Sequence, residues 1–106
     1  LNVELAPNPT SVKYEEIVID DYNLEQNYPN PFNAMTNVKF RVLNSGNTKL
    51  EIFDISGKRI STVLNEFLNS GSYEIRINAA EMASGIYFYK LTINDYSDIK
   101  KMILIK

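Results

Sequence analysis

The chain has 106 residues, of which 44% are apolar, and its formal net charge is −2; this length is typical of one small domain. It contains no Cys, His or Trp. These absences exclude disulfides, cysteine- and histidine-based catalysis and Cys- or His-ligated metal sites, and they favour a binding or structural module without a cofactor.

The composition is typical of a β protein. Ile is frequent and Ala is scarce, a balance that favours strands over helices, and the 13 Asn residues favour polar turns. No apolar run reaches the roughly 20 residues of a membrane-spanning helix, and no signal-peptide pattern is present. Because the chain begins at Leu1 rather than Met, we expect a mature product or a fragment of a longer protein.

The charge is unevenly distributed along the chain. Residues 1–37 contain six acidic side chains and one Lys, whereas residues 38–106 contain seven acidic and ten basic ones. The basic side chains alternate with acidic ones and form no cluster, so we predict no nucleic-acid binding. The sequence predicts an acidic leader followed by a mildly basic domain.

The leader combines short apolar stretches with strand breakers. Residues 1–5 and Tyr14–Ile19 each have strand-forming potential, but the prolines within Ala6–Thr10 and the pair Asp20–Asp21 interrupt them. We interpret residues 1–23 as a linker that is able to form strands.

Two prolines flank an Asn in the next stretch, residues 24–33. Pro29 and Pro31 have no backbone donor and a fixed φ, and each pushes the preceding residue toward an extended conformation. This stretch is therefore expected to run along a sheet edge or to cross one end of a sandwich, not to form a central strand.

Alternating apolar and polar side chains predict strands over most of the remaining chain. We place them around residues 36–42, 49–53, 60–64, 73–77, 85–93 and 99–106. Turns are predicted at 44–47, 54–57 and 94–95, a polar loop after residue 64 through Ser70–Gly71, and one helical turn in 78–84 whose Met82 fills the core. Apolar side chains on both faces near Gly85 predict a central strand that is covered on both sides there. About seven strands at this spacing predict an all-β fold, an immunoglobulin-like antiparallel β-sandwich.

Few side chains suggest chemistry. The pairs Asp20–Asp21 and Asp95/Asp98 offer oxygen ligands for Ca²⁺, but they lack the spacing of an EF-hand loop, and we interpret them as turns or solvated faces. The aromatic run Tyr87–Tyr89 is compatible with a sugar-binding platform, although alternating aromatic side chains more often pack in a core. We predict no metal site and no enzyme activity.

Four motifs occur in order in the second part of the chain. Leu24–Asn33 reads LEQNYPNPFN, Phe53–Ile60 reads FDISGKRI, Met82–Leu91 reads MASGIYFYKL and Lys100–Lys106 reads KKMILIK. In this order they resemble the motifs of type A C-terminal sorting domains, which are carried by cargo proteins of the type IX (Por) secretion system. Ala34 and Met35 depart from that pattern, since the family commonly has Pro-Ser there.

The resemblance implies a non-catalytic secretion signal. The implied partners are the type IX translocon, an outer-membrane shuttle barrel, a sortase-like protease and a passenger domain upstream. The implied location is the outer cell surface or the medium of a Gram-negative bacterium, after periplasmic transit. The residues to which the resemblance assigns a sorting role are Pro29, Asn30, Pro31, Phe32, Asp54, Gly57, Ser84, Gly85, Lys100, Lys101 and Lys106.

We accordingly divide the chain into two parts. Residues 1–23 are a linker, the end of the passenger domain or an added strand, and residues 24–106 are the sorting domain. The basic C-terminal strand is expected at a sheet edge, where a partner can add a strand, and cleavage is expected in the stretch before Leu24. We expect a monomer. The alternatives are an extracellular adhesion or assembly module that donates residues 1–19 to a neighbour, and a carbohydrate-binding module.

Overall fold

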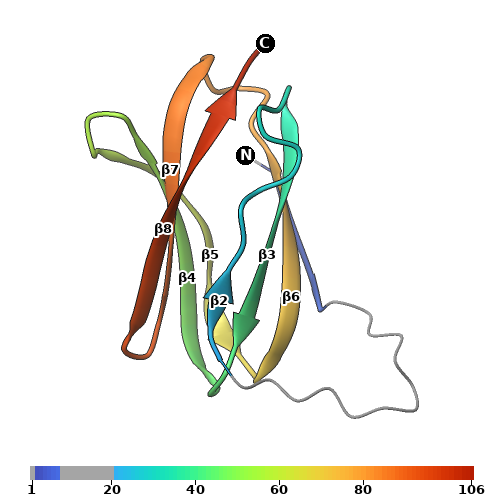
Figure 1. The fold of residues 1–106 in the computed structure, drawn as a ribbon, viewed down its shortest axis with the longest axis vertical. Helices are drawn as coiled ribbons and strands as arrows, with labels where there is room; N and C mark the ends of the chain where they lie inside the picture. The colour runs from blue at the N-terminus through green and yellow to red at the C-terminus, as the bar shows by residue number, and fades with distance from the viewer. Residues whose placement is uncertain (1, 8–20) are drawn as a thin grey trace.

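The computed structural model describes the backbone of residues 2–7 and all of residues 21–106. The strands in these residues are β1 (Asn2–Pro7), β2 (Asn23–Leu24), β3 (Met35–Val42), β4 (Gly46–Asp54), β5 (Arg59–Leu68), β6 (Gly71–Asn78), β7 (Gly85–Ile93) and β8 (Tyr96–Leu104). They form two antiparallel four-stranded sheets that pack face to face (Figure 1). Sheet A has the strand order β1-β6-β3-β2, and sheet B has the order β5-β4-β7-β8. The predicted immunoglobulin-like β-sandwich is confirmed.

The core lies between the two sheets, where the alternating apolar side chains of each strand meet. Val38 and Phe40 of β3 face inward from sheet A, and Tyr89 and Leu91 of β7 face inward from sheet B; all four are at most 1% exposed. Strands with a period of two bury every second side chain, so the sequence pattern of these strands directly determines which face is inside.

Several strands begin earlier or end later than the sequence predicts; β4 begins at Gly46, within the turn predicted at 44–47, and β6 begins at Gly71. β5 continues to Leu68, because its second half pairs with β4 from Leu50↔Leu64 to Gly46↔Leu68. The polar loop predicted after residue 64 is therefore wrong. Residues 65–67 of this strand are all exposed, so no alternation of buried and exposed side chains marks it in the sequence. β8 begins at Tyr96 rather than Ile99, because Asn94 and Asp95 alone connect it to β7.

The prediction that β7 is covered on both sides near its start is also wrong. β7 does lie between β4 and β8, but Ile86 is 36% exposed and Phe88 is half-buried. In a two-layer sandwich only one face of each sheet meets the other sheet, so the second apolar face of this strand is open to solvent.

The short segment between β6 and β7 forms a turn. The Met82 amide donates to the Ala79 carbonyl (3.0 Å), and Met82 packs partly buried against the core, as predicted. Among the described residues no helix is long and apolar enough to cross a membrane.

The N-terminal strand β1 pairs with β6 from Asn2↔Asn78 to Pro7↔Tyr73. It lies at the edge of sheet A, a position that tolerates a Pro because one side of the strand needs no partner. The strand expected within residues 1–5 is thus present and extends to Pro7. The second strand predicted in the leader, Tyr14–Ile19, lies outside the described residues.

Candidate functional site

The four motifs lie together at one end of the sandwich. Strand β4 ends at this end, β7 begins there and β8 finishes beside it, with Asp54 opposite Tyr87 and Gly85 opposite Leu104 (Figure 1). The segment between β2 and β3 passes along β8, where Phe32 forms a parallel bridge with Leu104. We call residues 26–35, 54–58, 79–85 and 101–106 the motif end.

The first motif covers the outer edge of the last strand. The Phe32 amide donates to the Ile103 carbonyl (2.9 Å), and the Ile105 amide donates back to the Phe32 carbonyl (2.9 Å). Two residues earlier in both segments, the Ile103 amide donates to Oδ1 of Asn30 (2.9 Å). Phe32 itself is buried in the core. Residues of the first motif thus supply the hydrogen bonds that a neighbouring strand would otherwise supply to β8.

A buried polar cluster fixes the start of this motif. The Tyr89 hydroxyl donates to the Glu25 carbonyl (2.8 Å) and accepts from the Asn27 amide (2.7 Å). The Asn27 side chain donates to Thr36 Oγ1 (2.9 Å) and to the Pro29 carbonyl (3.1 Å), and Thr36 donates to the same carbonyl (2.9 Å). Burial raises the pKa of Tyr89 above its usual value, so the hydroxyl stays protonated and able to donate.

The two prolines lie on the surface. The Tyr28–Pro29 and Asn30–Pro31 peptide bonds are cis, and both proline rings are exposed. Tyr28 beside them is 80% exposed. These rings are therefore accessible to a partner, while the backbone between them is held by the core and by β8.

The second motif forms the tight turn between β4 and β5. One Asp54 carboxylate oxygen accepts from the amides of Ser56 (2.9 Å) and Lys58 (3.0 Å) and from the Ser56 hydroxyl (2.6 Å). These hydrogen bonds, that of the Ser56 side chain first, lower the pKa of Asp54. Gly57 has a φ of 89°, which favours glycine. The turn predicted at residues 54–57 is therefore confirmed.

The third and fourth motifs meet at the C-terminus. The Lys106 amide donates to the Ser84 hydroxyl (3.1 Å), and the Lys106 ammonium donates to the Ala80 carbonyl. Gly85 has a φ of 154°, and no atom lies within 4 Å of the position that a Cβ would occupy, so backbone conformation rather than space favours glycine here. The last residue is therefore fastened to the turn that precedes β7.

Residues 26–106 match the family model described as the secretion system C-terminal sorting domain. The chain belongs to this family. Its members act as C-terminal signals for type IX secretion, which implies export to the cell surface or secretion, and they are in general non-catalytic. No similar curated protein and no similar solved structure was found.

The lysines of the last motif do not form one basic patch in this sorting domain. Lys100 and Lys101 occupy successive positions of β8 and point to opposite faces of the sheet, and Lys106 is bound to Ala80. The open edge expected at this basic end is only partly present, because the first motif covers β8 at Ile103 and the Gln26 side chain donates to the Lys101 carbonyl (2.6 Å). Within the described residues, the uncovered part of the β8 edge is its first half, around Ser97 and Ile99.

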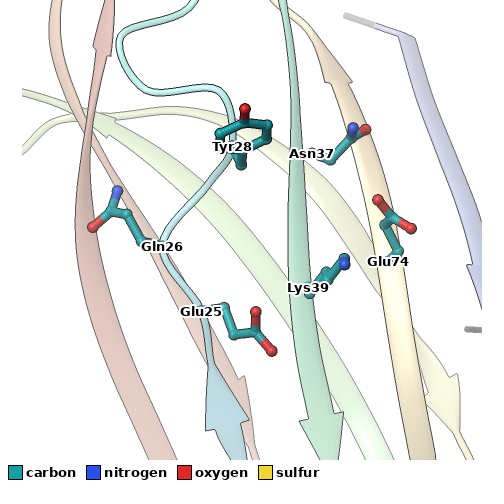
Figure 2. Close-up of a pocket in the computed structure, with 6 residues that line it drawn as sticks. All are labelled: Glu25, Gln26, Tyr28, Asn37, Lys39 and Glu74. Atoms are coloured by element: carbon teal, nitrogen blue, oxygen red, sulfur yellow. The ribbon is translucent and has the colours of Figure 1, made fainter.

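A shallow groove of about 190 Å³ runs beside the first motif on the outside of sheet A (Figure 2). In the view of Figure 2, Lys39 of β3 lies between the carboxylates of Glu25 and Glu74. Tyr28, Gln26 and Asn37 complete the lining. The groove is open and its charges alternate in sign, so it offers no enclosed place for a small ligand.

Several features of the sorting domain were not found from the sequence. Asn27 and Tyr89 are 62 residues apart in the chain, and no spacing signal connects them.

Tyr87 and Tyr89 are buried, so the aromatic platform that a carbohydrate-binding module would need is absent from β7. Asp21 pairs with Arg41 (3.0 Å), and Asp98 accepts from the Ile99 amide (2.8 Å).

Proposed function

We propose that this domain is a non-catalytic signal that carries an upstream passenger through the type IX secretion system, and that the secretion machinery binds its motif end. The translocon and an outer-membrane shuttle barrel are the partners at this step, in a Gram-negative bacterium after periplasmic transit. A sortase-like protease then cuts before Leu24, and the passenger is released or attached to the surface. The observation that carries the proposal is the convergence of four distant motifs at one end of the fold.

The motif residues divide by exposure into two roles. Asn30 and Phe32 are committed to bonds with the last strand, and Asp54 is committed to its own turn. Pro29 and Pro31 present exposed rings, so they serve recognition in addition to guiding the chain into the fold. Asn30, Phe32 and Asp54 therefore support export by maintaining the fold. Pro29 and Pro31 support it by direct contact with the secretion machinery.

The test uses a reporter passenger fused to the domain in a bacterium with a type IX system. Deleting residues 101–106 would also remove Met102 and Leu104 from the core, so a loss of export there would not separate recognition from folding. The double change Pro29→Ala and Pro31→Ala removes two exposed rings and keeps every core side chain. We expect this variant to lose export more than tenfold at a temperature at which circular dichroism shows that it is folded.

The matched control is Lys39→Ala, an exposed side chain on the outside of β3. It should be exported like the unaltered domain. Normal export of the chain that lacks residues 101–106 would contradict the sorting function itself. Normal export of the proline variant alone would contradict recognition of the rings and leave the sorting function standing.

A second candidate function, an assembly module that exchanges a strand, is favoured by the pairing of β1 with the edge of β6. An edge strand can pair with the same site in a second copy. Size-exclusion chromatography over a hundredfold range of concentration tests this. A sorting domain runs as a monomer throughout, whereas a strand-exchanging module shifts to larger species.

A further inference from the structure

The outer face of sheet B carries apolar and basic side chains close together. Because Tyr87 and Tyr89 point into the core, their neighbours on β7 point outward, and the same alternation holds on β8. The outward pairs across these strands are Ile86↔Ile103, Phe88↔Lys101 and Lys90↔Ile99. We call these six residues the basic–apolar face.

Apolar side chains on this face form a continuous band. Ile86 is 36% and Ile99 is 52% exposed, and Phe88 and Ile103 are half-buried. On β4, Phe53 pairs with Phe88 and extends the band toward the second motif. Single exposed apolar side chains are common on soluble domains, but a continuous band on one sheet face marks an interaction surface.

The accessible charges around the band are cationic. Lys90 and Lys101 lie within the face, and Lys49 lies further along β4 on the same side. The acidic side chain among them, Glu51, is only 9% exposed and forms an ion pair with Arg59 (3.2 Å). A partner that approaches this face therefore meets positive charge around an apolar centre.

The outer face of sheet A has a different character. Its exposed large apolar side chains among the described residues include Met35, at 38%, and Tyr28, which lies beside Asn37 and is 80% exposed. Lys39 stands opposite Glu74, and Arg41 is paired with Asp21. Basic side chains on this face, such as Lys39 and Arg41, thus have acidic neighbours, and Lys39 and Met35 serve as control positions for the basic–apolar face.

We propose that the basic–apolar face is a docking surface for a protein partner whose contact area has an apolar centre and an acidic rim. The proposal rests on the proposed secretion function and assigns this partner to the export machinery. Burial of the apolar band supplies affinity, and Lys90 and Lys101 supply orientation and discrimination. The face is continuous with the motif end, since Lys101 belongs to the last motif and Ile86 directly follows Gly85.

The test compares charge reversal on the two faces in the reporter fusion. The variant Lys90→Glu with Lys101→Glu should reduce export at least tenfold, and Ile86→Ser with Ile99→Ser should do the same. The controls on sheet A, Lys39→Glu and Met35→Ser, should be exported normally. Lys90 lies opposite Glu51 of β4, so the reversal places two carboxylates across from each other there. The melting temperature of all four variants is therefore measured, and export is compared at a temperature at which each variant is folded.

Two further measurements identify the occupant. A photoreactive side chain at Ile99 should cross-link to a component of the type IX machinery in cells, and one at Lys39 should not. The purified domain is also tested for binding to anionic vesicles and for self-association. If the Lys90/Lys101 reversal abolishes either of these, the proposal that the partner is a protein of the export machinery is wrong. Normal export of both face variants, with export of the proline variant still blocked, would overturn the docking surface while leaving the sorting function intact.

Discussion

The hydroxyl of Tyr89 joins sheet B to the start of the first motif, and its removal gives the sharpest test of the fold. The change Tyr89→Phe deletes two hydrogen bonds, to the Glu25 carbonyl and from the Asn27 amide. The Glu25 residue is exposed, so its carbonyl can turn to water at little cost. The Asn27 amide is buried, and an unsatisfied buried donor costs about 1–3 kcal/mol. We therefore expect the free energy of unfolding to fall by about 2–3 kcal/mol.

The matched control is Tyr87→Phe, two residues earlier on the same face of β7. The Tyr87 hydroxyl makes one hydrogen bond, to the Ala83 carbonyl (2.6 Å), at a partly buried position. Its loss should cost about 1 kcal/mol. Urea unfolding followed by far-ultraviolet circular dichroism measures both variants, since the chain has no Trp to serve as a fluorescent probe.

Amide hydrogen exchange then locates the effect. Tyr89→Phe should accelerate exchange at Asn27 and at Phe32, whereas Tyr87→Phe should leave both unchanged. Because burial raises the pKa of Tyr89, its neutral form contributes stability that is complete below about pH 10 and is lost as the pH rises further. The Phe variant should lose less stability in that alkaline range. Equal costs for the two variants, with no local change in exchange at Asn27, would refute the reasoning.

Three smaller predictions concern the turns. Ala34 has a φ of 72°, so Ala34→Gly should raise the free energy of unfolding by about 0.5–1 kcal/mol; a lower melting temperature would contradict this. Gly85→Ala should lower it by about 1–3 kcal/mol through backbone strain, and an unchanged urea midpoint would show that no strain arises. The lowered pKa of Asp54 contributes stability that is present above the ordinary value of 3.8 and lost as the pH falls through the folded-state pKa. Asp54→Ala should therefore reduce the melting temperature at neutral pH, with a gap to the unaltered domain that narrows below about pH 4; a constant gap would contradict the assignment.

Strands are predictable from the sequence where one face is buried and the other is solvated. In β3 the alternation around Val38 and Phe40 marks both the strand and its inner face, because hydrophobic burial acts on every second side chain. The turn at Asp54–Gly57 is equally predictable, since a short side chain that accepts amide bonds and a residue that tolerates positive φ are local requirements.

Prediction fails where the determining contact is distant or the pattern is broken. Apolar side chains on both faces of β7 predict burial on both sides, but apolarity does not reveal what covers a face, and Ile86 is exposed. The end of β5 escapes prediction because residues 65–67 are all exposed, so no alternation marks this part of the strand. The contact between Asn30 and Ile103 spans 73 residues, and no local signal in either segment predicts it.

The bonds at the motif end make presentation of the C-terminus depend on the folded state. The Ile105 amide has its partner only when Phe32 is seated in the core, and the Lys106 amide has its partner only when Ser84 stands at the start of β7. The bond to Ser84 needs only the pairing of β7 with β8, whereas the bond to Phe32 forms only when the first motif, which leads into β3 of sheet A, lies against β8. A partner that binds the motif end together with the basic–apolar face therefore binds a completed sandwich and distinguishes it from an unfolded chain carrying the same motifs. Single changes at Phe32 are expected to abolish export through loss of this geometry, even though the side chain is buried and touches no partner.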